Sequence, residues 1–371
     1  MNRYIFTFLF CVLLIFSMGL LMVFNTTSAE VLDRSLAQST HFGLFKQLSY
    51  ACIAVVLAAI VGYFGYESLL KYSKVFLWIG VVFLIMVFVP GIGQQINGAH
   101  RWMRFMGISF QPSEFVKYLI PLFYIEQITK RNEPLRLKSF LILLATAAIP
   151  IGLILIEPDN GTVAIIIAGL VVLFVLTRIR WVYWALPLLV LAIIGGLAAS
   201  QMKHVPDRIR VYLHPESDLR GKGHQPYQAK IAAGSGQLWG KGLGESLQKL
   251  DYLPEARSDY IAAIYAEEFG YVGILALLFL YMLIGYLGFY MASCCRDMRG
   301  FYVTAVFTFL LCFQAFLNLG VVSGLLPSKG TNLPFFSQGG SSLFANFMTV
   351  AVILNIAHRS GKKYVTKKWS K

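Results

Sequence analysis

The sequence predicts an all-α fold, a polytopic membrane protein of ten transmembrane helices with one large outward loop between helices 7 and 8. Composition is the first observation: 57% of the 371 residues are hydrophobic and 13% are charged, and the mean hydropathy of +0.65 lies far from that of soluble domains. Spacing is the second. The apolar residues gather in runs of about 20 residues, the length that crosses the hydrocarbon core of a bilayer.

Ten apolar runs meet that length. In chain order, the expected spans are residues 4–24, 47–67, 75–94, 112–129, 139–157, 161–177, 181–200, 262–292, 301–326 and 341–358. Because their number is even, both termini are expected on the same side of the membrane.

Basic residues set the expected orientation, because cytoplasmic loops are enriched in Lys and Arg. Placing both termini in the cytoplasm puts most short-loop cations there, together with the basic tail 359–371. The long loop 201–261 then faces outward. We expect a single domain over residues 1–371, located in the cytoplasmic (inner) membrane as a multi-pass protein in contact with membrane lipid.

The formal net charge is +14. On a membrane chain, basic residues mark cytoplasmic loops more often than a nucleic-acid surface, so no nucleic-acid partner is expected. The outward loop nevertheless carries an excess of cations, among them Arg208, Arg210 and Lys241. A cationic outer surface suits a polyanionic substrate.

Asp259 stands at the outer end of the eighth run, after a glycine-rich segment that begins at Leu238. An acid at a helix start is ordinarily a cap. Its neighbours Glu255 and Arg257 and the basic loop favour a carboxylate tuned for acid/base work or cation binding. Glu267, deeper in the run, is expected to pair internally.

Two further acidic sites have alternative interpretations. Glu114 and Lys117 stand three residues apart, where they can form an ion pair on one helix face; an internal structural pair and a substrate contact both remain open. Asp159 lies in the turn Glu157-Pro-Asp-Asn-Gly-Thr162. A polar hairpin is favoured there, and a cation site or a contact to a substrate hydroxyl is the alternative.

Residues 326–342 join the last two runs and are rich in proline, glycine and hydroxyl side chains. This composition indicates an ordered re-entrant loop. Its backbone N–H groups and Lys329 could bind phosphate oxygens; a plain turn is the alternative.

Taken in order, eight short motifs resemble the SEDS family (shape, elongation, division and sporulation proteins) over nearly the whole chain, whereas any one of them would be weak. They are Gly98-Ala-His-Arg-Trp102, Gln111-Pro-Ser-Glu114, Glu157-Pro-Asp-Asn-Gly-Thr162, Pro215-Glu-Ser-Asp218, Gln228-Ala-Lys-Ile-Ala-Ala-Gly-Ser-Gly236, Tyr252-Leu-Pro-Glu-Ala256, Glu267-Glu268 and Ser337-Gln-Gly-Gly-Ser-Ser342. Segments 238–256 and 326–330 look more like the cell-division members than the elongation members.

The resemblance implies a peptidoglycan glycosyltransferase that polymerises lipid II at the outer face of the cytoplasmic membrane, for septal synthesis. In that reaction the 4-hydroxyl of an acceptor N-acetylglucosamine attacks the anomeric carbon of N-acetylmuramic acid, and undecaprenyl pyrophosphate leaves with inversion. Implied partners are a class B penicillin-binding protein and other divisome proteins.

Asp259 matches the family's essential aspartate, implied to be the general base or the ligand of a divalent cation, Mg²⁺ or Mn²⁺, the one cofactor that the resemblance admits. The chain departs from the family where Arg257 replaces the usual His and Gln338 replaces a Tyr. Residues expected to contact substrate are Arg101, Trp102, Ser337, Ser341 and the four cations Arg208, Arg210, Lys241 and Lys329, which are candidates to neutralise the pyrophosphate. Glu114, Lys117, Asp159, Glu255 and Glu267 are expected to form the polar network around them.

Two other functions fit part of the pattern. A lipid II flippase also places charges in membrane cavities, but it needs polar groups on a path to the cytoplasmic side, and the motifs here cluster at the outer ends of spans. A non-catalytic division scaffold that activates a partner synthase is the second. The intact Asp259 argues against pure scaffolding.

Overall fold

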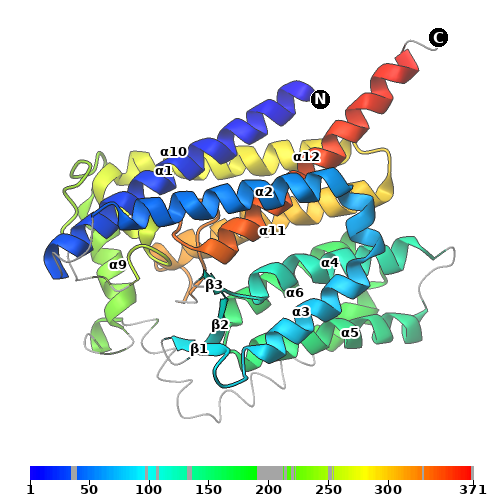
Figure 1. Ribbon diagram of the computed structural model, residues 1–371, viewed down its shortest axis with the longest axis horizontal. Helices are drawn as coiled ribbons and strands as arrows, with labels where there is room; N and C mark the ends of the chain where they lie inside the picture. Colours follow the sequence, from blue (N-terminus) through cyan, green and yellow to red (C-terminus); the bar gives the residue numbers. More distant parts are fainter. Residues whose placement is uncertain are drawn as a thin grey trace.

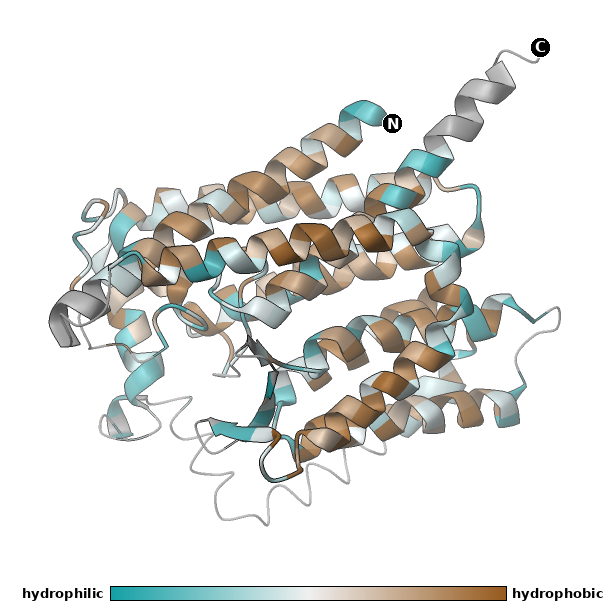
Figure 2. Cartoon of the chain, in the orientation of Figure 1, coloured by the Kyte–Doolittle hydropathy of each residue, from teal (hydrophilic) through white to brown (hydrophobic). Residues whose placement is uncertain are grey.

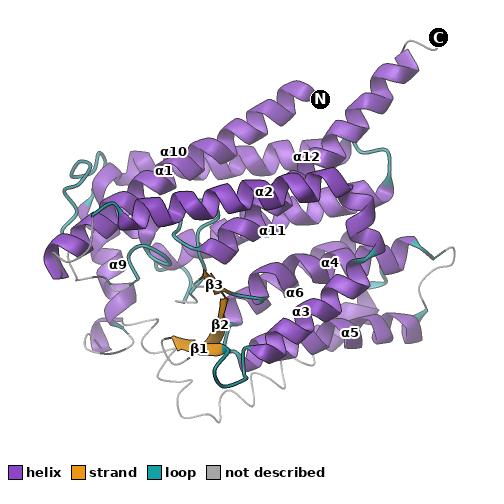
Figure 3. Ribbon diagram, viewed as in Figure 1, coloured by secondary structure: helices purple, strands orange, loops and turns teal. Residues whose placement is uncertain are grey.

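The computed structural model describes residues 1–34, 40–96, 99–105, 108–131, 136–189, 212, 215–218, 221, 223–249, 253, 255–327 and 330–368. Long helices dominate it and lie side by side along its longest axis (Figure 1; Figure 3). They are α1 (Asn2–Arg34), α2 (Phe42–Lys71), α3 (Ser73–Met86), α4 (Ser113–Thr129), α5 (Leu137–Ile156), α6 (Asn160–Leu176), α10 (Ile261–Ser293), α11 (Met298–Val322) and α12 (Gly340–Lys368).

The predicted helical membrane fold is confirmed. Six described helices are long and apolar enough to cross a membrane, and α3 and α6 are shorter apolar helices. Hydrophobic residues cover the middle of the helices, and polar residues gather in the connections at the two ends (Figure 2). Of the expected span 181–200, residues 181–189 are helical and the rest lies outside the described residues. The number ten therefore stays a prediction.

Both termini lie at one end of the bundle, together with the α2–α3 and α10–α11 connections, the end of α4 and the start of α5 (Figure 1). The opposite end carries the turn between α5 and α6, the short helices η1 (Pro215–Asp218) and α9 (His224–Ser235), and the segment before α10. The side of the membrane that each end faces stays a prediction.

The expected span 75–94 is too long by about two turns, because α3 ends at Met86. Pro90 cannot continue a helix without losing a hydrogen bond, and Gly91 has a φ of +89°. The chain then forms an antiparallel sheet where the sequence indicated only a loop. Its strands, in the order β1-β2-β3, are β1 (Gly93–Ile96), β2 (Ala99–Phe105) and β3 (Ile108–Phe110).

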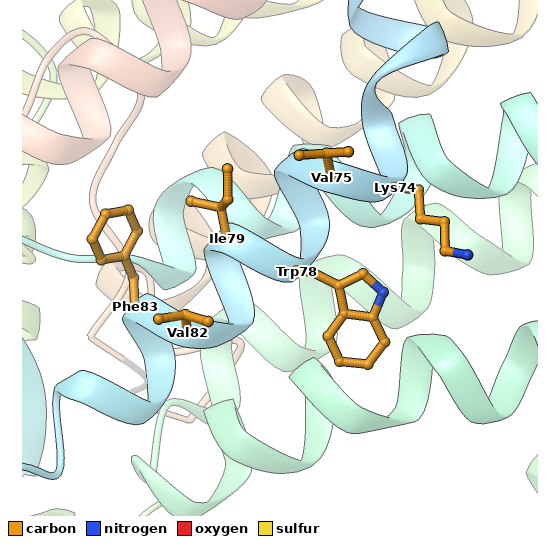
Figure 4. A pocket seen from close by; sticks show the side chains of 6 residues that line it. All are labelled: Lys74, Val75, Trp78, Ile79, Val82 and Phe83. Atoms are coloured by element: carbon orange, nitrogen blue, oxygen red, sulfur yellow. The ribbon is translucent and has the colours of Figure 1, made fainter.

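The interior of the bundle is formed by α4, α11 and α12, whose side chains are mostly buried. By contrast, α3 presents an open apolar groove of about 450 Å³ lined by Lys74, Val75, Trp78, Ile79, Val82 and Phe83 (Figure 4). Exposed hydrocarbon along a membrane-length bundle is the surface expected to face lipid.

Candidate active site

Asp259 is half-buried and lies two residues before α10, which begins at the end of the bundle opposite the termini (Figure 1). Its backbone carbonyl accepts a hydrogen bond from Asn318 Nδ2 of α11 at 2.8 Å. Among the described contacts, its carboxylate takes part in no hydrogen bond or ion pair. The carboxylate is therefore available to a ligand.

Arg101 of β2 and Gly330 meet Asp259 from two other parts of the chain. A Cβ built on Gly330 would lie 3.2 Å from Asp259 Oδ2 and 3.8 Å from Arg101 Nη1. The φ of Gly330 is +55°, a conformation that favours glycine. The carboxylate and the guanidinium thus converge on one backbone position that has no side chain.

The surroundings disfavour the charged form of Asp259. Burial is the main cause and raises the pKa of Asp259 to about 7; the nearby Glu255 adds to the rise, and the Arg101 guanidinium opposes it. A carboxyl with this pKa can take up a proton near neutral pH, as a general base must.

The Glu157-Pro158 turn holds Arg101. Arg101 Nε donates to the Glu157 carbonyl at 3.0 Å, and Nη2 donates to the Pro158 carbonyl. The Glu157 side chain is fully buried, and neither of its carboxyl oxygens has a hydrogen-bond partner among the described residues. This turn between α5 and α6 therefore positions Arg101 through its backbone.

Asp159 caps α6 and joins it to α4. Its carboxylate accepts from Thr162 N, from Gln111 Nε2 and from Ser113 Oγ, each at 3.2 Å. Ser341 belongs to the same connection, because its buried hydroxyl accepts from Gln111 N at 2.9 Å. These groups join α4, α6 and α12 at the site.

The loop that contains Gly330 is fastened by side-chain amides of α11. Asn318 Nδ2 donates to the Thr331 carbonyl at 2.6 Å, in addition to that of Asp259. Gln314 Nε2 donates to the Asn332 carbonyl at 2.9 Å. Standing four residues apart, the two amides lie on one face of the helix and fix the loop next to Asp259.

Glu114 and Lys117 form a buried ion pair of 2.6 Å, and Lys117 Nζ also donates to Gln314 Oε1 at 2.7 Å. The pair thereby connects α4 to the amide that holds Asn332. Ser337 has a similar role, since its hydroxyl donates to the Ser258 carbonyl at 2.6 Å and accepts from Leu333 N at 2.8 Å.

Lys241 is ion-paired to buried Glu267 at 2.6 Å, and a third of its side chain is exposed. Glu267 also accepts from Ser246 Oγ at 2.5 Å. This pair links the glycine-rich segment to α10, so the charge of Lys241 is already compensated within the protein.

The other predicted residues lie elsewhere. Trp102 follows Arg101 on β2, pairs with Gln94 of β1 and is partly buried. Glu255 is exposed and accepts from Ser258 Oγ at 2.8 Å. Arg208, Arg210 and Lys329 lie outside the described residues.

Gln314 and Asn318 lie inside the predicted span 301–326, where the sequence assigns them no separate role. The sequence does contain a signal for these two residues. Two amides spaced by four residues inside an apolar run are buried polar groups that need hydrogen-bond partners. The proximity of Gly330 to Asp259 had no such signal, since it follows only from the tertiary fold.

The described residues contain no group of three or more metal-ligating side chains. Asp259 fits a divalent cation as a single carboxylate ligand, which is how many Mg²⁺ sites are built when substrate phosphates complete the coordination.

The family model described as "Cell cycle protein", which covers FtsW, RodA and SpoVE, matches residues 6–362. The chain is 32% identical to the probable peptidoglycan glycosyltransferase FtsW of Trichlorobacter lovleyi, covering 92% of this chain and 90% of that protein. It is 35% identical to the Alcanivorax borkumensis protein of the same name, covering 91% and 88%. To the stage V sporulation protein E of Bacillus subtilis it is 33% identical, covering 94% and 95%.

Solved structures share the fold. One chain of a peptidoglycan synthase complex aligns with a TM-score of 0.77 at 23% identity, covering 95% of this chain and 97% of that one. The rod shape determining protein RodA of Thermus thermophilus aligns with a TM-score of 0.68 at 23% identity, covering 95% of each. With the ordered motifs, the match over residues 6–362 shows that this chain belongs to the FtsW, RodA and SpoVE family of cell cycle proteins, the SEDS family.

Proposed function

We propose that this protein is a peptidoglycan glycosyltransferase that polymerises lipid II at the outer face of the cytoplasmic membrane, for septal wall synthesis. The observation that carries the proposal is the convergence of Asp259 and Arg101 on Gly330, with the Asp259 carboxylate free of hydrogen bonds within the described structure. The names of the FtsW relatives support the activity and the division role.

Asp259 has the chemistry of the base in this reaction. Its carboxylate would accept the proton of the acceptor 4-hydroxyl as that oxygen forms its bond to the anomeric carbon, while the bond to the pyrophosphate oxygen breaks on the opposite face. A positioned base contributes typically about 10² to 10⁴ in rate. A carboxyl with a pKa of about 7 combines the charged form with a useful affinity for the proton.

Arg101 has the chemistry to stabilise the leaving group. Two of its donors are used by the Glu157 and Pro158 carbonyls, which fixes the plane of the guanidinium and leaves Nη1 on the side of Gly330. A fixed cation beside developing phosphate charge lowers the barrier without reorganising during the reaction. Among the predicted phosphate-binding cations outside the described residues, Arg208, Arg210 and Lys329 remain candidates.

The topology of the proposal places both termini in the cytoplasm and Asp259 outside. A class B penicillin-binding protein is the proposed partner, because the structurally similar chain comes from a peptidoglycan synthase complex. Other divisome proteins and a divalent cation, Mg²⁺ or Mn²⁺ on Asp259, belong to the same proposal.

A flippase is the second candidate function. The arrangement of the site argues against it, because Asp259, Arg101 and the groups that hold them gather at one end of the bundle. Lys117 of the Glu114–Lys117 ion pair also donates to Gln314. The pair is therefore a structural contact between helices of the bundle.

The experiment is polymerisation of labelled lipid II by purified protein together with its cognate class B penicillin-binding protein, with transpeptidation blocked and products separated on a gel. Wild type should make polymer, and Asp259→Asn and Asp259→Ala should make none. Glu245→Gln is the matched control, since it removes an exposed carboxylate of the same outer region and should retain activity. Polymer from a well-folded Asp259→Ala would overturn the role of Asp259; no polymer from wild type would favour the flippase or scaffold.

A further inference from the structure

The glycine-rich segment carries four large apolar side chains on its surface. Leu238 is 61% exposed, Trp239 79%, Leu243 54% and Leu247 60%. We call these four residues the apolar tip. None of them takes part in the reaction proposed above, and four large apolar side chains exposed to water would be unusual for one short loop segment.

The segment is held rigidly on α10 by its backbone. Tyr271 N donates to the Gln237 carbonyl at 2.8 Å, and Val272 N donates to the Leu238 carbonyl at 3.2 Å. These amides are free to do so because the helix is broken at Gly270, whose φ is +65°. A Cβ there would lie 2.3 Å from Gly240 N, so the close approach requires glycine.

The lysines of the segment turn inward and leave the apolar side chains outside. Lys241 pairs with Glu267 at 2.6 Å, and Lys249 pairs with Glu268 at 3.0 Å. The two lysines of this segment are therefore neutralised within the protein, and apart from Lys241 its large exposed side chains are the four apolar ones and Glu245.

The burial of the α10 side chains changes at the break at Gly270. Ile261 to Glu268 are all buried, whereas from Tyr271 onward one face of α10 stays buried and the other, with Tyr271, Val272 and Leu275, is exposed and apolar. The 23 residues from Tyr271 to Ser293 span about 34 Å at 1.5 Å per residue. The hydrocarbon core of a bilayer is about 30 Å thick, which puts Gly270 at its edge.

Helix α1 independently indicates the same position for the edge of the hydrocarbon core. Its apolar run, residues 4–24, spans about 32 Å and ends at Asn25. Asn25 Oδ1 accepts from Lys249 Nζ at 2.8 Å, and its Nδ2 donates to Glu268 Oε2 at 2.6 Å. Two helices therefore place the glycine-rich segment at the edge of the hydrocarbon.

We propose that the apolar tip inserts into the headgroup region of the adjacent leaflet, with the lipid surface itself as its partner. Tryptophan is enriched at that depth in membrane proteins, and the tip continues the exposed apolar face of α10 through the Leu238–Val272 hydrogen bond. Because the same segment is tied to Glu267 and Glu268 on the helix that follows Asp259, this anchor fixes the height of Asp259 above the lipid. The inference does not rest on the proposed enzymatic function.

Fluorescence quenching in proteoliposomes of phosphatidylcholine and phosphatidylglycerol tests the insertion. The chain has six tryptophans, so the signal of Trp239 is the difference between wild type and Trp239→Phe, both full-length and well folded. Phosphatidylcholine brominated near its headgroup should abolish most of that difference signal, deep-brominated lipid should remove less, and aqueous iodide should have little effect. The matched control is Trp102→Phe, which removes a tryptophan of β2 in place of Trp239.

Strong iodide quenching of the Trp239 signal with no effect of brominated lipid would overturn the proposal. So would protection from iodide that appears only when the class B penicillin-binding protein is added, because the tip would then be a protein-docking surface. As a second variant, Leu238→Ser with Leu243→Ser keeps Trp239 and should shift its quenching from lipid toward iodide; unchanged quenching would contradict anchoring by the tip as a whole.

Discussion

Asn318 of α11 holds Asp259 through its backbone: Asn318 Nδ2 lies 2.8 Å from the Asp259 carbonyl and 2.6 Å from that of Thr331. One amide thus sets the distance between the carboxylate-bearing segment and the loop that contains Gly330. The precision of the site depends on a buried side chain that has no need to touch the substrate.

Asn318→Ala should therefore lower polymerisation about 100-fold, the loss expected from a displacement of about 1 Å in a reacting group. It should also lower the free energy of unfolding by about 1–3 kcal/mol, because two carbonyls lose a donor. Lipid II polymerisation and thermal unfolding measure the two effects. Thr308→Val is the control on the same helix, since it removes a buried hydroxyl that has no hydrogen-bond partner in the described part of the chain. It should leave the rate nearly unchanged, and equal losses in both variants would contradict the positioning role.

The pH dependence follows from the pKa of Asp259, which is about 7. In the proposed mechanism the carboxylate form of Asp259 is the base, so the rate should rise as pH increases through about 7. Glu255→Gln removes a neighbour that raises the pKa and should move this limb to lower pH, whereas Arg101→Gln should move it higher. Single-turnover rates across pH 5 to about 9 give the midpoint of the rise in rate for wild type, Glu255→Gln and Arg101→Gln. The same midpoint in all three proteins would assign the titration to another group.

The raised pKa of Asp259 also makes the stability of the folded protein depend on pH. Because the folded-state pKa of Asp259 is above its unfolded value of about 3.9, the folded state binds the proton more tightly. This contribution is complete below about pH 4 and is lost as pH rises through about 7. Asp259→Asn should flatten the fall in unfolding temperature over that window. An unchanged pH profile of unfolding would contradict the raised pKa.

Gly330→Ala tests the space between Asp259 and Arg101. The added methyl group would lie 3.2 Å from Asp259 Oδ2 at a φ of +55°, so the carboxylate or the loop must shift. We expect kcat to fall about 100-fold with little change in membrane insertion. Gly234→Ala is the matched control, because its Cβ would meet no atom within 4 Å. Similar kcat values for the two variants would show that the convergence has no catalytic role.

The sequence predicted the helical membrane fold because a span is a local signal, about 20 apolar residues that must satisfy their own backbone. Motifs also singled out Asp259 and Arg101 as site residues, and their roles stay predictions. The sequence could not predict the sheet around Arg101, whose strands follow Pro90 in what looked like a plain loop. The roles of Gln314, Asn318 and Gly330 depend on contacts between segments far apart in sequence, which periodicity does not encode.

Arg101→Lys separates charge from geometry. Lysine keeps the positive charge but cannot make the two hydrogen bonds to the Glu157 and Pro158 carbonyls that fix the guanidinium. We expect about a 10-fold loss of rate for Arg101→Lys, which keeps the charge but loses the fixed geometry. Arg101→Ala should lose more, because it removes both the charge and the charge-assisted hydrogen bonds. Arg104→Ala removes an exposed cation of the same strand, which pairs with Ser109 of β3, and is the control. A loss of the same size there would indicate a general electrostatic effect.

Lys241 offers a test between substrate binding and structure. Its pairing with buried Glu267 predicts that Lys241→Met destabilises the protein by about 3–5 kcal/mol, because it leaves an uncompensated buried charge. Adding Glu267→Gln should restore most of the stability by removing that charge. If polymerisation returns with stability in the double variant, Lys241 acts through the fold; if the double variant is stable and inactive, Lys241 contacts the pyrophosphate, as the sequence alone suggested.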